Sequence, residues 1–154
     1  MGLLETVRPV TKHVLITISG EHRIDGQAQE PVTTKTKGEY YFRNGRHFVR
    51  FTQSPAAESG ADPVKNLFKF TPDCLEVIKS GGIESRMIFE KDRMNVVQYR
   101  TPSGILEMGM KATEIRLTEE PARIEICVDY ELHAGGSKIQ DSRVTIGVIP
   151  FPYF

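Results

Sequence analysis

The sequence predicts an all-β protein, a single antiparallel up-and-down β-barrel of about eight to ten strands with little helix. Apolar residues recur at every second position through most of the chain, which is the period of strands with one wet face. Short runs of Gly, Pro, Asn and Asp separate these segments, and no segment keeps the helical period of 3.6 residues over about ten positions. Links this short favour a meander over a Greek-key sandwich, and closure into a barrel removes exposed edges.

The first half of the chain is expected to form a series of strands joined by polar turns. We place these strands at residues 10–20, 32–42, 46–53, 64–71 and 74–79. Asn44-Gly45 lies between two of them and is the strongest hairpin signal in the chain, because both residue types accept a positive φ. Residues 54–63, SPAAESGADP, have no apolar period, so we expect a loop excursion that could hold a short helix.

The second half, residues 83–148, is expected to be a run of hairpins. Its turns are predicted at Lys91-Asp92, Pro102-Ser103-Gly104, Glu120-Pro121 and Ala134-Gly135-Gly136. Between them, residues of one phase form apolar stripes: Met87 and Phe89; Val97 and Tyr99; Leu106, Met108 and Met110; and Ile124, Ile126, Val128, Tyr130 and Leu132. These stripes are expected to face the inside of the barrel.

The chain ends in an aromatic tail at residues 150–154, PFPYF. Proline has no N–H to give to a ladder, so Pro150 and Pro152 are expected to stay outside the sheet and to hold the tail extended. We expect this tail to plug one mouth of the barrel or to dock onto another subunit.

Composition indicates one folded domain, residues 1–154, with ordinary hydrophobic and charged fractions. Twenty Lys and Arg balance twenty Asp and Glu, so no basic field predicts a nucleic-acid partner. No apolar run approaches the roughly 20 residues that span a bilayer, so no membrane partner is expected. Cys74 and Cys127 lie far apart without a metal or redox spacing, which is typical of free thiols in a reducing cytoplasm.

The sequence predicts no catalytic site. His13, His22, His47 and His133 show no spacing typical of metal ligands, and no Gly-x-Ser-x-Gly elbow surrounds a serine. Ser80-Gly81-Gly82 lacks the lysine and the helix of a phosphate-binding loop. We therefore expect a protein that is not an enzyme and that takes no metal ion and no cofactor.

The barrel interior is the remaining candidate for function. Barrels of this size either pack solid or hold one small ligand. Buried hydroxyls need partners, and methionine provides adaptable surface in permissive pockets, although a plain core accounts for both residue types as well. The candidate ligand-binding residues on the predicted inward phase are Thr36, Tyr40, Met87, Tyr99, Met108, Thr113 and Tyr130.

Residues 99–117, YRTPSGILEMGMKATEIRL, are similar to the YwiB-like family of small bacterial proteins of unknown function. Residues 36–38, 86–90 and 129–132 extend this resemblance over most of the chain. It implies a calycin- or lipocalin-like β-barrel, a bacterial source and a cytoplasmic setting, but it supplies no activity and no site residues. Ser103 departs from the aromatic residue that the family tends to place in this turn, and the tail at residues 150–154 is not a family feature.

Two hypotheses of function follow. The first is a non-enzymatic cytoplasmic barrel that binds a small, largely apolar molecule in its interior. The second is an interaction or oligomerisation module, such as a homodimer, that acts through its outer surface and the tail at residues 150–154.

Overall fold

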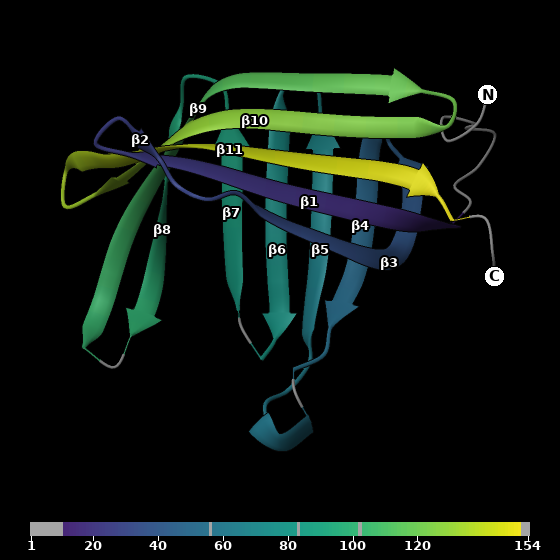
Figure 1. Cartoon of the computed structure of the whole chain (residues 1–154), viewed down its shortest axis with the longest axis horizontal. Coiled ribbons are helices and arrows are strands. Elements are labelled where there is room, and N and C mark those ends of the chain that lie inside the picture. Colours follow the sequence, from purple (N-terminus) through teal and green to yellow (C-terminus); the bar gives the residue numbers. More distant parts are fainter. Residues whose placement is uncertain (1–10, 56, 83, 102, 152–154) are drawn as a thin grey trace.

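The computed structural model describes residues 11–55, 57–82, 84–101 and 103–151, and most of them lie in strands (Figure 1). The strands are β1 (Lys12–Ile24), β2 (Gln27–Ala28), β3 (Val32–Arg43), β4 (Arg46–Gln53), β5 (Val64–Thr71), β6 (Cys74–Gly81), β7 (Ser85–Glu90), β8 (Met94–Thr101), β9 (Gly104–Glu120), β10 (Arg123–Ala134) and β11 (Ser137–Pro150). Within the described residues, the one helical element is a single 3₁₀ turn at Ala57–Ser59, inside the predicted loop excursion.

The strands form one sheet in the order β7-β6-β5-β4-β3-β1-β11-β10-β9-β8, and β2 pairs with β1. All neighbours in this order are antiparallel. Because β1 pairs with β11, the sheet curls into an up-and-down barrel that is nearly closed, as the sequence predicted. The remaining gap lies between β7 and β8, where the isolated bridge Lys91↔Ala112 and a hydrogen bond from Asp92 N to Ala112 O connect the two sides.

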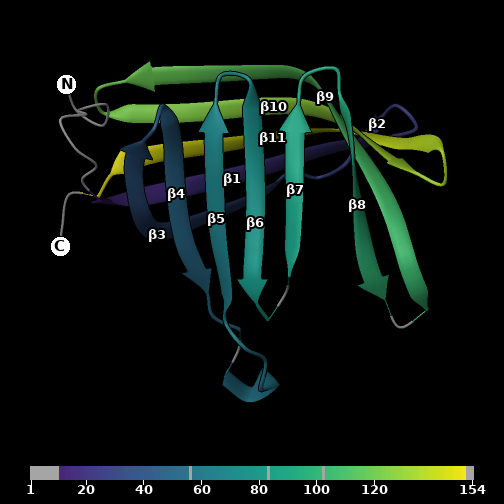
Figure 2. The same ribbon diagram turned by 180° about the vertical axis from the view of Figure 1, so that it is seen from behind.

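Two groups of strands face each other across the interior (Figures 1 and 2). β1, β10, β11 and the second half of β9 cross over β4 to β7 in both views. β8 and the first half of β9 leave the barrel as a hairpin arm, and the loop excursion extends from the far end of β4 and β5 (Figure 1).

Turn chemistry fixes the β3–β4 hairpin where the sequence predicted it. Asn44 and Gly45 have φ values of 53° and 75°, and Arg43 pairs with Arg46 directly beside them. A two-residue turn with two positive φ values matches the twist of the strands, so it sets the register of both.

The inward side chains of β4 to β7 form three rows across the sheet. The closed-end row is His47, Phe70, Leu75 and Phe89; the middle row is Val49, Phe68, Val77 and Met87; the rim row is Phe51, Asn66, Lys79 and Ser85. The closed end and middle pack against β1, β10 and β11, where Val14, Ile126 and Val148 are fully buried. The interior is therefore apolar and packed at one end and becomes polar toward the other.

The aromatic tail begins differently from the prediction. Pro150 is the last residue of β11 and lies opposite Val14, so the expectation that it stays outside the sheet is wrong. A strand end tolerates proline because no further ladder bond needs its nitrogen. The next residue, Phe151, donates its backbone N–H to His13 O at 3.1 Å, and Lys37 Nζ lies 4.6 Å from its ring centroid. Residues 152–154, on which the plugging and docking expectations depend, lie outside the described residues.

Candidate ligand-binding site

A chain of three polar side chains lies at the closed end of the barrel. His47 Nδ1 lies 2.8 Å from the Tyr40 hydroxyl, and His47 Nε2 lies 3.0 Å from Glu119 Oε1. Phe42 and Phe70 hold the imidazole, with ring centroids 4.9 and 5.0 Å away. The geometry fits a neutral imidazole that accepts from Tyr40 and donates to the Glu119 carboxylate.

Burial sets the ionisation of this chain. It lowers the pKa of His47, and the hydrogen bond and charge of Glu119 oppose that shift only in part. Burial, with a smaller contribution from the Glu119 charge, raises the pKa of Tyr40. Both groups therefore stay neutral near pH 7, and their hydrogen bonds let polar atoms pack inside an apolar core.

A cavity of about 250 Å³ lies at the opposite, open end of the barrel. Most of its wall is apolar, and its residues come from both sides of the barrel: Ile18, Thr34, Phe51, Gln53, Asn66, Phe68, Val77, Lys79, Met87, Phe89, Tyr130, Val144 and Ile146. The base of the loop excursion is fixed at this rim, since Gly82 N donates to Pro63 O at 3.2 Å. An added Cβ on Gly81 would lie only 2.3 Å from the same oxygen, so glycine permits the close approach.

The polar side chains of the cavity gather at the rim. Asn66 is only 3% exposed, and its Nδ2 donates to Gln53 Oε1 at 3.0 Å. Lys79 lies next to Asn66 across the β5–β6 ladder. The site thus combines an apolar floor with amide and ammonium groups at the opening, which is the usual make-up of small-molecule sites.

The structure brings together two of the predicted ligand-binding residues, Met87 and Tyr130, in the wall of this cavity. Tyr40 is buried below it in the closed end. Thr36 is half-buried and donates to Lys37 O at 3.3 Å, outside the cavity lining.

The remaining inward predictions fall on β8 and β9. Met108 is half-buried on β9, between Val97 of β8 and Ala134 of β10. Tyr99 pairs with Leu106 on the hairpin arm, and its side chain lies outside the described part of the structure.

The orientation predicted for Thr113 is wrong. Its side chain is exposed, and its hydroxyl donates to Asp129 O at 3.2 Å. The cause is a β-bulge: Ala112 pairs with Tyr130 and Glu114 with Asp129, so Thr113 is an extra residue in β9. Before the bulge the even-numbered side chains of β9 face the core, and after it the odd-numbered ones, such as Ile115 and Leu117, do so. Thr113 lies at the change and faces outward.

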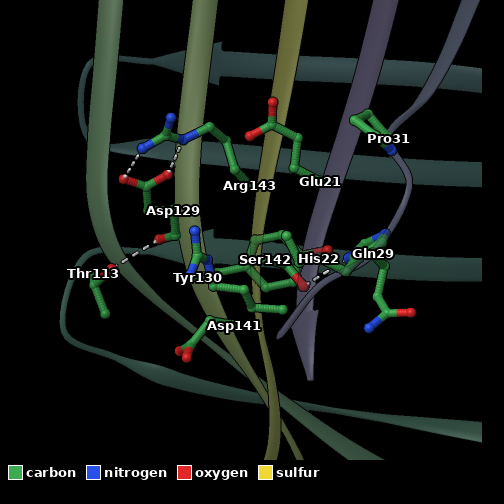
Figure 3. A pocket seen from close by; sticks show the side chains of 12 residues that line it. Glu21, His22, Gln29, Pro31, Thr113, Asp129, Tyr130, Asp141, Ser142 and Arg143 are labelled. Carbon is green, nitrogen blue, oxygen red and sulfur yellow. Dashed lines mark hydrogen bonds and ion pairs between the residues drawn. The ribbon is translucent and has the colours of Figure 1, made fainter. Parts of the chain in front are cut away.

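A larger groove of about 480 Å³ lies where β1, β10 and β11 leave the barrel (Figure 3). Its polar groups bond mainly to one another. Arg143 pairs with Asp129, and this contact lowers the pKa of that carboxyl. His22 Nδ1 lies 2.8 Å from Ser142 Oγ, as the dashed line in the figure shows. These mutual contacts account for the groove, so the interior cavity is the stronger candidate site.

The inward positions of His47, Asn66, Lys79 and Glu119 were not predicted from the sequence. The hairpin turn at Asn44-Gly45 contained a signal for His47, since its register places that residue opposite Phe42 and close to Tyr40. Asn66 and Lys79 continue the alternation of Phe68 and Val77 and could have been assigned inward. Glu119 faces inward only after the bulge, which the sequence did not indicate.

Two kinds of structural feature are absent from the described residues. No group of three or more His, Cys, Asp and Glu side chains in these residues is placed to hold a metal ion. No helix in this part of the chain has the length and apolar character to cross a membrane.

Comparison with known proteins supports the same architecture. Residues 16–146 match a domain family of unknown function, DUF1934. The chain is 26% identical over 140 residues to the uncharacterized beta-barrel protein YwiB of Bacillus subtilis (strain 168). The aligned region covers 90% of this chain and 91% of that protein. The crystal structure of YwiB superposes with a TM-score of 0.76 at 18% identity, covering 92% of this chain and 93% of YwiB. The last comparison supports the barrel fold alone.

Proposed function

The chain belongs to the DUF1934 family of domains of unknown function, and from that premise we propose that it binds a small, mainly apolar molecule at the open end of its barrel. One observation supports the proposal: the apolar interior is sealed at one end and meets solvent at the other. Val49 and Leu75 are fully buried, whereas Phe51 and Val77 keep 7 and 8% of their surface exposed to the cavity. Apolar surface of this kind gains free energy when a ligand covers it.

The size of the cavity limits the ligand. An apolar cavity of about 150 Å³ holds benzene, and ligand sites for larger molecules measure about 300–1,000 Å³. A volume of about 250 Å³ therefore suits one ring or a short alkyl chain, and the open mouth lets a longer group project. The proposed role is to bind and release this molecule, because the cavity walls offer apolar contact surface and hydrogen-bonding groups.

The test is a titration with 1-octanol, followed by methyl NMR of Ile18, Met87 and Val144. We expect saturable shifts at these methyls with a Kd of about 10 μM to 1 mM. Thr34→Trp places a large ring at the mouth and should weaken binding at least about tenfold. Thr33→Trp, the matched control, adds the same ring to the opposite face and should leave binding unchanged. Unshifted cavity methyls at saturating octanol would exclude the proposal.

A second candidate function, self-association, is favoured by the hairpin arm. Among the described strands β8 has one neighbour in the sheet, and its other edge pairs with no residue of this part of the chain. Val96 and Ile105 on this arm are 57 and 65% exposed. A second copy of the chain that pairs along β8 would cover both the edge and these side chains.

The mass in solution tests this alternative. If the chain forms dimers through β8, Ile105→Lys should lower the mass measured by light scattering from two chains to one. Ile139→Lys changes another exposed isoleucine, on the β10–β11 hairpin, and should leave the dimer intact. The measurement is made at about 100 μM, about 100 times a dimer dissociation constant of 1 μM. A wild-type chain that is monomeric at this concentration would rule out this function.

A further inference from the structure

We propose that the molecule held in the cavity carries a carboxylate at one end, and that Lys79 at the rim is the partner of that anion. This inference rests on the proposed function and names the class of its ligand. The order of the inward rows, the charge at the rim and the amide pair beside it support this assignment.

The three rows give the cavity a direction. The middle row is entirely apolar, and the rim row next to it contains Asn66, Lys79 and Ser85 as direct cross-strand neighbours. A ligand with its apolar part against Val77 and Met87 would place its other end level with these polar groups. The cavity thus fits an amphipathic molecule better than a wholly apolar one.

Lys79 gives that rim its charge. Among the described residues that line the cavity, Lys79 is the one basic side chain, and none is an aspartate or a glutamate. None of the ion pairs within the described residues includes it. The carboxylate of Glu84, on the adjacent turn, accepts a hydrogen bond from Gly81 N at 3.4 Å. The ammonium group is therefore available to an anion from outside the chain.

The amide pair adds a second donor. Asn66 is buried, and its Nδ2 donates to Gln53 Oε1 at 3.0 Å, so the NH₂ group of Gln53 is the second amide donor at the rim. Lys79 and Gln53 thus flank Asn66, one across the β5–β6 ladder and one through this hydrogen bond. Two donors on either side of one residue suit the two oxygens of a carboxylate.

Three ligands of one chain length test the inference: octanoate, 1-octanol and octylamine at pH 7.5, titrated against the wild-type chain. Octanoate is more strongly hydrated than octanol, so without a cation at the rim it would bind more weakly. We expect the reverse order, with octanoate about 3- to 10-fold tighter than octanol and octylamine the weakest.

The variants separate the role of Lys79 from that of the cavity. Lys79→Met should weaken octanoate at least about fivefold and leave octanol within about twofold, while Lys79→Arg should keep the preference for the acid. Lys65→Met removes an exposed lysine from the outer face of β5 and should change neither affinity.

The outcomes distinguish this inference from the proposed function. Octanol that fails to shift the cavity methyls would overturn both. Octanol that binds, together with weaker octanoate and no effect of Lys79→Met, would overturn the carboxylate partner alone and leave a cavity for neutral molecules.

Discussion

His47 shows how the environment of one residue decides its chemistry. In the sequence it is one histidine in a β-strand, beside basic and aromatic neighbours. In the fold it is 1% exposed, and both ring nitrogens have partners, Tyr40 and Glu119. The same imidazole that would titrate near pH 6.5 in a peptide is thus held neutral as part of the core.

This burial predicts a pH dependence of stability. Folding lowers the pKa of His47, so below about pH 6.5 the unfolded chain binds a proton that the folded chain binds less readily. The contribution of the neutral His47 to the free energy of unfolding is therefore complete above about pH 6.5. It is lost as the pH falls from there through the lower pKa of the folded state. Replacement by Gln removes the titration: we expect His47→Gln to be less stable by about 1–3 kcal/mol at pH 7.5. The deficit should shrink by up to about 1.4 kcal/mol at pH 5.5.

Urea unfolding at both pH values measures this difference. His13→Gln makes the same substitution at an exposed histidine and serves as the matched control. A deficit of His47→Gln that stays constant between pH 7.5 and 5.5 would show that the imidazole does not resist protonation in the fold.

Gly38 predicts a second effect of a single residue. A Cβ at this position would lie 2.4 Å from Ile16 Cδ1 and 2.5 Å from Arg50 O, and the backbone oxygen cannot turn away. We expect Gly38→Ala to reduce the free energy of unfolding by about 1–3 kcal/mol, because overpacking moves strands. At Gly20 the nearest atom is 3.6 Å away, so Gly20→Ala should be neutral or slightly stabilising in the same urea titration. Equal loss in the two variants would contradict the steric argument.

The bulge in β9 is the element with the largest effect on what faces the interior. Before the bulge, Met110 and Ala112 point inward; after it, Ile115 and Leu117 do so on the other parity. A single irregularity thus lets one long strand serve both the hairpin arm and the closed end. It also turns Glu119 toward His47, where regular pairing would have pointed it outward.

This geometry makes a test by deletion possible. Removal of Thr113 closes the bulge without changing the phase on either side, since its neighbours already pair with Tyr130 and Asp129. We expect the deletion to leave a folded barrel that is about 1–2 kcal/mol less stable, from the lost hydrogen bond and twist. The measurements are soluble yield and the midpoint of urea unfolding.

Deletion of Arg116 is the matched control. It lies in the regular part of the strand between Ile115 and Leu117, so its removal turns one of these two side chains to solvent. We expect this variant not to fold. If the Thr113 deletion also fails to fold, the extra residue is needed for the curvature of the barrel, and the argument from phase is wrong.

The whole molecule differs in stability from one side of the barrel to the other. Within the strands that the structure describes, β1, β10 and β11 each have a neighbour on both sides, whereas β8 has one and lies in the arm outside the barrel (Figure 1). Few buried contacts and a free edge favour local opening. The gap between β7 and β8 is therefore the place where the sheet is expected to open first.

Amide hydrogen exchange followed by mass spectrometry checks this prediction. Peptides from β1, β10 and β11 should exchange at least about tenfold more slowly than peptides from β8. Protection of β8 that equals the protection of β11 in dilute protein would contradict it. If protection of β8 rises with protein concentration, the free edge is covered by a second copy.

Much of this architecture could be predicted from sequence because it depends on local signals. Alternation of apolar residues, together with the turn at Asn44-Gly45, placed β4 and β5 at the observed bounds. Part of the candidate site was predicted for the same reason, since Met87 and Tyr130 follow the inward phase of their strands. Thr113 failed because a bulge is a property of two paired strands, and the side of the barrel left open depends on how the whole sheet curls.

The sequence by itself determined that this chain is an antiparallel up-and-down barrel with an apolar inward face. That result follows from the period of the strands and from the chemistry of the turns, which act over a few residues. Only the tertiary structure decided which end of the interior is packed, because that depends on partners such as His47 and Glu119, which are far apart in the chain. It also decided that Lys79 and Asn66 share the rim of the cavity, because cross-strand register, and not sequence distance, sets which side chains meet.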